Sequence, residues 1–276
     1  MEENRLMEDV AKALENVRAQ CPLIHNITNY VTVNDVANIV LAVGASPIMA
    51  DDIAEAGDIA SIAGALVLNI GTLNARTVES MVEAGKRANQ AGVPVVLDPV
   101  GAGASALRNE TTERLLKEVK LTVLRGNLSE ISFIAGEQSN TKGVDAGEAD
   151  ADNDAVAIAK KVAKQLGCVV GITGQVDVVS DGTRVAKIEN GVKLLGKVTG
   201  TGCMTSALVG SYCGANRDAF TATVAGIATM GMAGEISYKA QADRGTGSFH
   251  IGIIDAVSQM DGETVKVWAK LHEVER

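Results

Sequence analysis

The stretch VPVVLDPV, residues 93–100, decides the fold class of this chain. Its apolar residues run without the alternation of a half-solvated strand, which is typical of a strand buried on both faces of a parallel sheet. Similar runs occur at ALVLNI (65–70), LTVLRGN (121–127) and CVVGITG (168–174). Segments with helical spacing separate these runs, so the order predicts an α/β fold: a central, mostly parallel sheet with helices on both faces.

The segment 74–90 illustrates the helical spacing between two of these strands. Val78 and Val82 share one face, and Asn74 is a favourable residue for capping the start of the helix. The AGVP turn that follows ends the helix before the next strand.

The pattern changes after residue 176. Three short apolar segments, VDVVS, TRVAKIE and VKLL, follow one another, and the dipeptides Asp181-Gly182 and Asn190-Gly191 separate them. Asp-Gly and Asn-Gly are preferred in type I′ hairpin turns. We therefore expect an antiparallel meander at one edge of the parallel sheet.

Two helices rich in small residues are expected after the meander. TGTGC (199–203) opens the first, and residues 219–234 form a second that is apolar enough to be buried. The 29 glycines of the chain predict tight turns and close backbone contacts. No linker composition interrupts the sequence, so we expect one domain over residues 1–276.

Composition limits the classes of partner. The formal charge is −9 and aromatic residues make up only 3%, so neither phosphate neutralisation nor base stacking favours nucleic acid as a partner. The acidic start MEENRLMEDV is unlike a signal peptide, and we expect a cytoplasmic protein with no membrane partner. The four cysteines lack zinc-ligand spacing and are expected to be free thiols.

Two glycine-rich segments match nucleotide-binding patterns only in part. GAGASA (101–106) fits the dinucleotide pattern, but Pro99 lies where a tight strand-to-helix turn is needed, which disfavours an oxidoreductase. GVKLLGKV (191–198) fits the P-loop pattern except at Val198, where Ser or Thr must reach Mg²⁺. We interpret this second match as chance.

The acidic stretch 145–154 contains the D-x-D-x-D order that begins a calcium loop. The loop pattern fails because Ala155 stands where glycine is needed and Lys161 stands where a bidentate Glu is needed. We expect a solvated loop that leads into a helix over 154–166.

Polar residues follow several of the predicted strands. They are Asn69, Asp98, Arg125, Asn127 and Thr173. Each alone is typical of an ordinary turn, but ligands of open parallel sheets bind outside the carboxyl ends of the strands. Several such residues at one edge therefore favour a binding site there.

TGTGC (199–203) is a candidate anion site. Glycines ahead of a helix direct backbone N–H groups to one point, and the helix dipole favours negative charge there. Cys203 in the first turn would have its thiolate stabilised and could then accept a proton. The alternative, a small buried residue at a helix start, is equally compatible with the sequence.

The segment from Asn127 to Glu130 also has two interpretations. N-x-x-E is the pattern of a helix capping box, which alone explains it. If this strand end faces a nucleotide, Glu130 beside Asp98 would supply carboxylate oxygens for Mg²⁺. The two roles are compatible.

Taken together, the motifs of residues 20–250 resemble the hydroxyethylthiazole kinases, a thiamin-salvage family of the ribokinase-like superfamily. The resemblance rests on HNITNYVTVNDVAN (25–38), GASPIMADD (44–52), GALVLNIGTL (64–73), VVLDPVGAGA (95–104), RGNLSEI (125–131), GVDAGE (143–148), ITGQVDVVSDG (172–182) and KVTGTGC (197–203).

The resemblance implies a ribokinase-like fold and ATP-dependent, Mg²⁺-assisted phosphorylation of the hydroxyl of 4-methyl-5-(2-hydroxyethyl)thiazole. It also implies a homotrimer with its sites between subunits. The positions that match the family's substrate contacts are Asn29, Val31, Met49 and Gly200. The positions expected at ATP are Arg125, Thr173 and Asn127.

The same resemblance places Asp98 and Glu130 at the metal. Residues 200–203 would form the anion hole, with Gly200, Gly202 and Cys203 as the catalytic group. Many kinases of the superfamily have Asp at the position of Cys203, so this thiol either deprotonates the hydroxyl or orients it. We expect His25 to be a structural or pocket-wall residue rather than the base.

Three alternatives stay open at the level of sequence. One is a superfamily kinase for another alcohol such as hydroxymethylpyrimidine, although the HNITN and GASPIM segments favour thiazole. Another is an ATP-dependent dehydratase of hydrated nicotinamide nucleotides, which would be expected to have Asp in place of Cys203. The third is a nucleotide-binding protein without catalytic activity.

Overall fold

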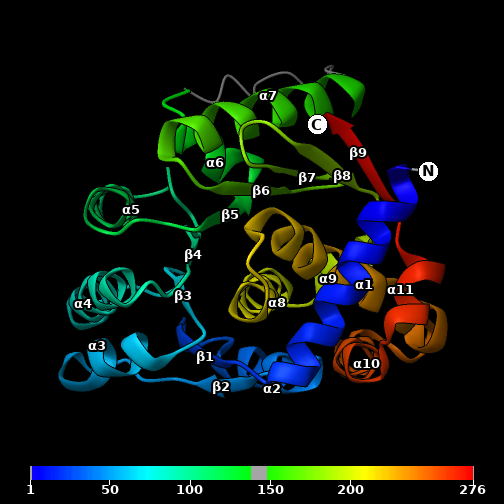
Figure 1. The fold of residues 1–276 in the computed structure, drawn as a ribbon, viewed down its shortest axis with the longest axis horizontal. Coiled ribbons are helices and arrows are strands. Elements are labelled where there is room, and N and C mark those ends of the chain that lie inside the picture. The colour runs from blue at the N-terminus through cyan, green and yellow to red at the C-terminus, as the bar shows by residue number, and fades with distance from the viewer. Residues whose placement is uncertain (1, 138–147, 276) are drawn as a thin grey trace.

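The computed structural model describes residues 2–137 and 148–275, and within them nine strands form one sheet in the order β2-β1-β3-β4-β5-β6-β7-β8-β9 (Figure 1). The parallel strands are β1 (Leu23–Ile27), β2 (Ser46–Ile48), β3 (Ala65–Asn69), β4 (Val95–Asp98), β5 (Val123–Asn127) and β6 (Val169–Thr173). The antiparallel edge consists of β7 (Asp177–Ser180), β8 (Val185–Ile188) and β9 (Leu271–Glu275).

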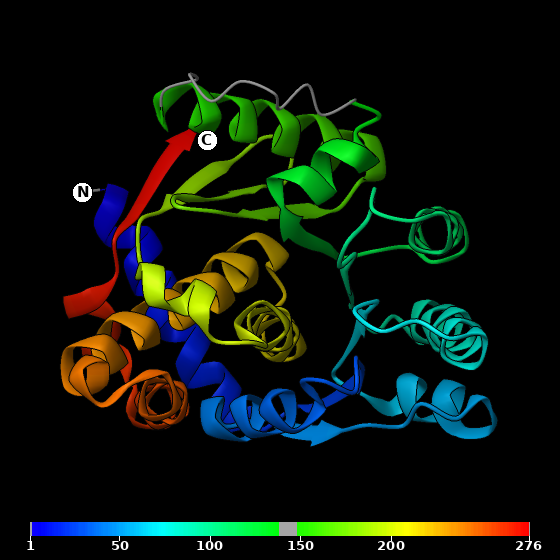
Figure 2. The ribbon, with the colours of Figure 1, turned by 180° about the vertical axis from the view of Figure 1, so that it is seen from behind.

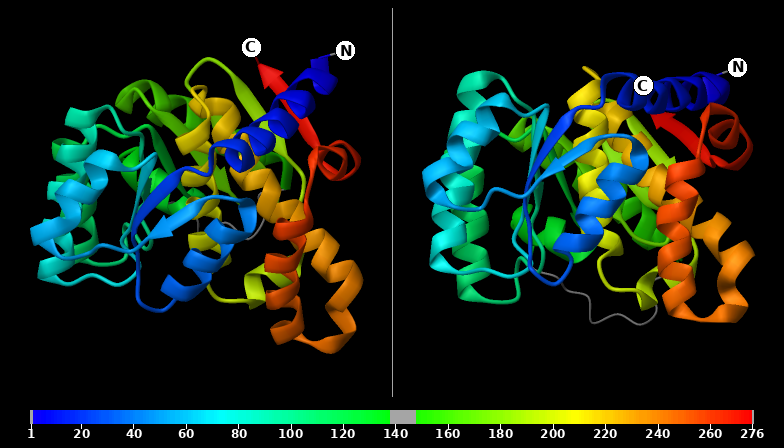
Figure 3. Two further views of the ribbon diagram at one scale, coloured as in Figure 1. Left: turned by 60° about the horizontal axis from the view of Figure 1, so that its bottom comes forward. Right: turned by 90° about the horizontal axis from the view of Figure 1, so that it is seen from below.

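Helices cover both faces of this sheet, on opposite sides in the views of Figure 3. One layer consists of α1 (Glu2–Gln20), α2 (Val33–Val43), α8 (Thr201–Ala215), α9 (Ala219–Gln241), α10 (Thr246–Gln259) and α11 (Gly262–Trp268). The other consists of α3 (Ile53–Ile62), α4 (Ala75–Ala91), α5 (Ala106–Glu118), α6 (Leu128–Ile134) and α7 (Glu148–Leu166). Short 3₁₀ helices span Lys193–Lys197 and Ala242–Arg244. The predicted α/β fold class is confirmed.

Successive residues of the central strands are buried against different helix layers. In β3, Ala65 and Val67 join the apolar core under α8, whereas Leu66 and Leu68 join the core under α3 and α4. All four are at most 2% exposed. The uninterrupted apolar runs in the sequence therefore reflect burial on both faces, since strand side chains alternate between them.

α8 and α9 lie inside the curve of the sheet, as Figures 1 and 2 show. Small residues permit this close packing: a Cβ on Gly210 would lie 2.3 Å from Val67 Cγ2, and one on Gly226 would lie 2.7 Å from the backbone of Val209. Among the described helices, α9 alone is long and apolar enough to cross a membrane. However, 78% of its apolar 18-residue stretch is buried inside the protein. α9 is thus the buried helix that the sequence predicts.

The predicted helix after β3 forms with the expected cap. α4 begins after Asn74, whose side chain accepts from Thr77 N, while Thr77 Oγ1 accepts from Asn74 N over 3.3 Å. Gly92 ends the helix in the left-handed conformation, with φ of 72°. Both ends of α4 are therefore set by local residues.

One prediction for the antiparallel edge is wrong. VDVVS and TRVAKIE supply β7 and β8, but VKLL lies in a 3₁₀ helix rather than a third meander strand. β9, from the far end of the chain, pairs with β8 instead. Asn190 explains the departure, because its side chain donates to Trp268 O over 2.7 Å and accepts from Lys270 N over 2.8 Å. These bonds hold residues 268–270, just before β9, against Asn190, where the sequence predicts a hairpin turn.

The acidic stretch is also ordered differently from the prediction. α7 begins at Glu148, so residues 148–154 of the stretch are helical rather than part of a loop. Residues 145–147 lie outside the described residues.

The strand order contains one point at which the winding direction reverses. The chain passes from β1 through α2 to β2 on one side, and then places β3 on the other side of β1. In open α/β sheets, ligands bind in the crevice at the carboxyl ends of such strands. The topology therefore favours a ligand site at the ends of β1 and β3.

Candidate active site

Asn69 and Asp98 meet at the carboxyl ends of two adjacent strands. They are register partners at the ends of β3 and β4, and Asn69 Nδ2 donates to Asp98 Oδ2 over 2.9 Å. Ser206 Oγ donates to the same oxygen over 2.8 Å. Sequence reasoning missed Ser206, although it lies three residues after Cys203 and so on the same side of α8.

Cys203 lies in the first turn of α8 and is half-buried. Two amide nitrogens donate to its sulfur: Asn29 Nδ2 over 3.2 Å and Asn69 Nδ2 over 3.3 Å. Asn29 follows β1, so the two strands at the reversal point supply one amide each. The structure thus brings the predicted Asn29, Asp98 and Cys203 together around Asn69.

The N-terminus of α8 has no side-chain cap. Gly200 occupies the N-cap position with φ of 87°, which favours glycine, and Met204 N donates the first helical bond to Gly200 O over 2.8 Å. The N–H groups of Thr201, Gly202 and Cys203 come before this first helical bond and take no part in it. An uncapped helix start of this kind suits an anion.

Arg125 connects this helix start to the neighbouring strand ends. Its Nη1 donates to Gly202 O over 3.1 Å, and its Nη2 donates to Thr173 Oγ1 over 2.7 Å. The guanidinium is also 3.7 Å from Asp98 Oδ2. Arg125 is only 8% exposed, and its Nε–H has no hydrogen-bond partner among the residues that the structure describes.

The electrostatics of Asp98 follow from its burial. The side chain is 2% exposed, and this desolvation raises the pKa of Asp98 to about 6. The nearby Arg125 guanidinium and the donated bonds from Ser206 and Asn69 oppose the rise. A cation bound at this carboxylate would oppose the rise in the same way as Arg125.

Glu130 forms the capping box that its spacing predicts. Asn127 Oδ1 accepts from Glu130 N over 2.9 Å, and Glu130 Oε2 accepts from Asn127 N over 2.8 Å. Glu130 Oε1 accepts from Gly101 N over 2.8 Å, so the GAGA segment is held against this carboxylate. The Asn127 side chain therefore acts as a helix cap.

The carboxylates of Asp98 and Glu130 suit Mg²⁺ as a donor set. Mg²⁺ keeps several waters and is usually bound by one or two carboxylates together with substrate phosphates. In the part of the chain that the structure describes, no group of three or more His, Cys, Asp or Glu residues gathers into a metal cluster. Water and phosphate oxygens would complete the coordination at these two residues.

The remaining predicted contacts differ in how far they are buried. Val31 is 58% exposed, and Met49, like Cys203, is half-buried beside the core under α8. His25 is fully buried, its Nε2–H donates to Ala50 O over 2.7 Å, and burial lowers its pKa. A neutral ring tied to a carbonyl fits the structural role expected for His25.

A cavity of about 740 Å³ opens beside Arg125, Thr173 and Gly202. Its lining also includes apolar residues, namely Val176, Val192, Leu195, Ile227 and Met230. Asp177 also lines it, and burial raises the pKa of Asp177 to about 7. A lining that combines cationic and hydroxyl groups with apolar side chains suits the phosphates and the base of a nucleotide.

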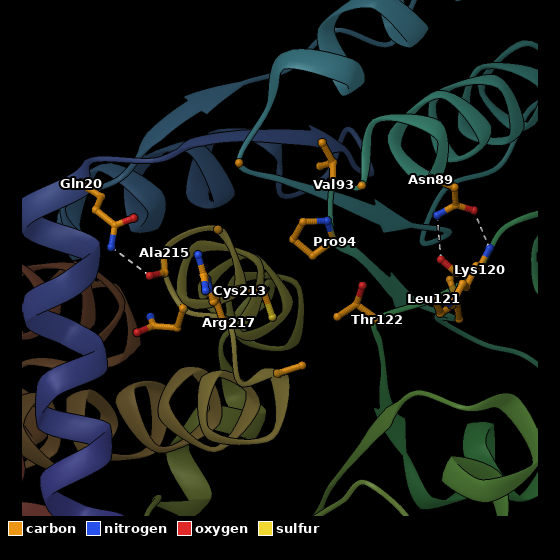
Figure 4. A pocket seen from close by; sticks show the side chains of 15 residues that line it. Gln20, Asn89, Val93, Pro94, Lys120, Leu121, Thr122, Cys213, Ala215 and Arg217 are labelled. Carbon is orange, nitrogen blue, oxygen red and sulfur yellow. Dashed lines mark hydrogen bonds between the residues drawn. The ribbon is translucent and has the colours of Figure 1, made fainter.

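A second pocket, of about 640 Å³, lies at the amino ends of the strands and is shown in Figure 4. Its amides already have partners within the protein: Gln20 Nε2 donates to Ala215 O over 2.9 Å, and Asn89 exchanges bonds with the backbone of Lys120. It contains none of the site residues that the sequence predicts. The carboxyl ends of the strands therefore remain the candidate active site.

Comparisons with known proteins identify the family of the chain. The model of the "Hydroxyethylthiazole kinase family" matches residues 14–263. The chain is 61% identical to a hydroxyethylthiazole kinase from Ruminiclostridium cellulolyticum, over 97% of this chain and 98% of that protein. The solved structure of a hydroxyethylthiazole kinase protein from Pyrococcus horikoshii OT3 is 39% identical, with a TM-score of 0.88, and the match covers 96% of this chain and 99% of that one.

The fold extends to more distant proteins. A ribokinase-like superfamily protein from Enterococcus faecalis has a TM-score of 0.64 at 9% identity, over 91% of this chain and 89% of that one. This likeness concerns the fold alone.

Proposed function

The chain belongs to the hydroxyethylthiazole kinase family, and from this premise we propose how its residues transfer a phosphoryl group to the thiazole alcohol. The family assigns the chain to the kinases of thiamin salvage. We propose that ATP is the phosphoryl donor and that 4-methyl-5-(2-hydroxyethyl)thiazole is the acceptor. One observation carries the proposed mechanism: the uncapped start of α8, with Cys203 in its first turn, is in contact with Arg125 through Gly202.

The proposed reaction is an in-line displacement. The hydroxyl oxygen of the thiazole forms a bond to the γ-phosphorus, while the bond between that phosphorus and the β,γ-bridging oxygen breaks and ADP leaves. The hydroxyl proton passes to Cys203 Sγ, which orients the alcohol before transfer. The N–H groups of residues 201–203 stabilise the negative charge on the transferred group, because they are fixed in position before the reaction.

Arg125 holds the triphosphate in this proposal. It contacts the start of α8 and Thr173 from two different nitrogens, which fixes the plane of its guanidinium. Arg125 also lines the cavity, so its guanidinium can donate to a phosphate oxygen there. The cavity beside Arg125 would take the nucleotide, with the base against its apolar lining residues.

Asp98 and Glu130 would hold Mg²⁺, which when bound neutralises charge on the β- and γ-phosphates. Asp98 is held by the donated bonds of Asn69 and Ser206, so its position does not depend on the metal. Glu130 is held by the backbone N–H groups of Asn127 and Gly101.

Asn29 would contact the thiazole by its carbon atoms rather than by its amide. Its Oδ1 accepts from both Thr32 N and Thr32 Oγ1 over 3.1 Å, and its Nδ2 donates to Asn69 and Cys203. No donor or acceptor of the side chain is left over. Met49 and Val31 would complete an apolar wall, with Gly200 near the hydroxyl.

We also propose a homotrimer in which each site lies between subunits. Tyr30 is 77% exposed and Val31 is 58% exposed, although both directly follow the buried Asn29. A neighbouring subunit would cover these apolar side chains and close the thiazole pocket. Light scattering on the purified protein measures the mass directly, and a monomer would contradict this assembly.

The experiment that tests the function measures ADP release with Mg-ATP, with and without hydroxyethylthiazole, for the unmodified protein and for Cys203→Ala. Thiazole-dependent release that is lost in the variant supports the proposal. ADP release that does not depend on thiazole would contradict the substrate assignment. Full activity in Cys203→Ala would contradict the proposed role of the thiol.

A further inference from the structure

We infer that Asn69 is the positioning residue of this site, which holds the Cys203 sulfur as a proton acceptor and orients the Asp98 carboxylate at the same time. The inference rests on the proposed role of Cys203 and extends it to Asn69, which the sequence marks only as one of several polar residues at strand ends. Its basis is the hydrogen-bond pattern of a single side chain that is 1% exposed.

The orientation of the Asn69 amide is determined by a backbone donor. Its Oδ1 accepts from Gly71 N over 2.9 Å, and a backbone N–H can only donate. Asn29 Nδ2 is a second donor to the same oxygen, over 3.0 Å. The opposite end of the amide is therefore the NH₂ group.

Both hydrogens of that NH₂ group are committed. One is directed to Asp98 Oδ2 over 2.9 Å and the other to Cys203 Sγ over 3.3 Å. One planar side chain thus fixes the separation between the proposed proton acceptor and the proposed metal-binding carboxylate.

Asn29 reinforces the arrangement from the other side. Its Oδ1 must face Thr32 N, which also can only donate, so its Nδ2 faces the sulfur. The sulfur of Cys203 consequently receives two N–H groups, neither of which can accept the thiol proton. A hydrogen bond donated to a charged acceptor is stronger than one donated to a neutral acceptor, so the loss of either donor matters most when the sulfur carries negative charge.

Gly71 leaves the room that this pair of amides needs. A Cβ at Gly71 would lie 2.8 Å from Asn29 Nδ2 and 2.9 Å from Asn69 Oδ1. The close approach of backbone to both amides is thus built into the loop after β3.

The test measures alkylation of Cys203 by iodoacetamide as a function of pH, with the Cys203 peptide followed by mass spectrometry. For each variant, the rate near neutral pH is divided by its own limiting rate at high pH, so that changes in access to the sulfur cancel. This ratio reports the share of thiolate, which a purely structural role of Asn69 would not change.

We expect the ratio to fall about tenfold in Asn69→Ala, since one charge-assisted hydrogen bond is lost. Asn69→Asp keeps the shape of the side chain but provides no N–H, and the ratio should fall there too. Asn26→Ala is the matched control, because Asn26 is equally buried, at 1% exposed, but donates to Ile24 O instead. Its ratio should stay within about twofold of the unmodified protein, because this substitution removes no hydrogen bond to the sulfur.

An unchanged ratio in both Asn69 variants would overturn the inference, as would an equal fall in Asn26→Ala. If Asn69→Ala shows no cooperative thermal unfolding, Asn69→Asp and Asn29→Ala provide the same comparison, since each removes an N–H from the sulfur. The readout does not depend on turnover. If Cys203→Ala keeps full kinase activity, the proposed function falls while the alkylation ratio still decides whether Asn69 acts on the sulfur.

Discussion

Asn69 and Asp98 end adjacent parallel strands in direct register, and the amide of Asn69 connects the Asp98 carboxylate to the sulfur of Cys203. This relationship joins the two chemical tasks of the site. The carboxylate belongs to the proposed metal position, and the sulfur belongs to the proposed proton acceptor. A substitution of Asp98 should therefore alter the surroundings of the Cys203 sulfur, and a substitution of Cys203 should alter those of the Asp98 carboxylate.

Replacement of Cys203 tests whether this residue accepts the hydroxyl proton or only fills its place in the site. We expect Cys203→Asp to keep thiazole-dependent ADP release, because a carboxylate accepts both the amide N–H groups and the hydroxyl proton. Cys203→Ser should lose much of the rate, since a hydroxyl is a far weaker proton acceptor at neutral pH. Steady-state kinetics check this, and a Ser variant as fast as the unmodified enzyme would exclude proton transfer to this position.

Asp98→Asn should stabilise the fold while it abolishes Mg²⁺-dependent turnover. The carboxyl has an ordinary pKa of 3.8 and a pKa of about 6 in the fold. Between these values the folded state binds more protons than the unfolded state, so this group's contribution to stability falls as pH rises through that window. Above it, the buried charge opposes folding by at most about 3 kcal/mol.

The comparison requires urea unfolding of both proteins at two pH values. Near pH 8 the Asn variant should have the larger free energy of unfolding. Near pH 4, where Asp98 is largely protonated, the difference should nearly disappear. A difference of the same size at both pH values would show that the charge of Asp98 is not its cause.

Arg125→Lys should impair the enzyme almost as much as Arg125→Ala. The guanidinium reaches Gly202 O and Thr173 Oγ1 from separate nitrogens, and a lysine ammonium cannot span both. We expect a rise in KM for ATP of at least about tenfold in either variant, in line with the loss of a charge-assisted contact. Arg76→Lys, at an exposed pair with Asp51, is the control and should keep its KM.

Gly226→Ala should destabilise the protein by about 1–3 kcal/mol, as expected for overpacking. Its Cβ would lie 2.7 Å from the backbone of Val209 in α8, so α8 and α9 would have to separate. Gly247 in α10 has no atom within 4 Å of the corresponding Cβ, and Gly247→Ala should leave stability unchanged or slightly higher. Thermal unfolding measures both, and equal effects would contradict the packing explanation.

The sequence by itself determined the elements whose signals are local. The apolar runs became β3 to β6, and the Asn74 cap and the capping box of Asn127 with Glu130 formed as their spacing predicts. Such signals are carried by neighbouring residues, because a cap or a buried strand is recognisable from a few positions. The family resemblance likewise predicts a role for Cys203 from the order of residues alone.

Only the tertiary structure decided which distant segments meet. β9 replaced the expected VKLL strand beside β8, since hydrogen bonds from Asn190 to the chain at 268–270 outweigh a local turn preference. Asn69 was recognisable as a polar strand end, but its contacts with Asp98 and Cys203 require three segments to converge. The free energy that brings them together comes from burial of the two apolar cores, which no short window of sequence contains.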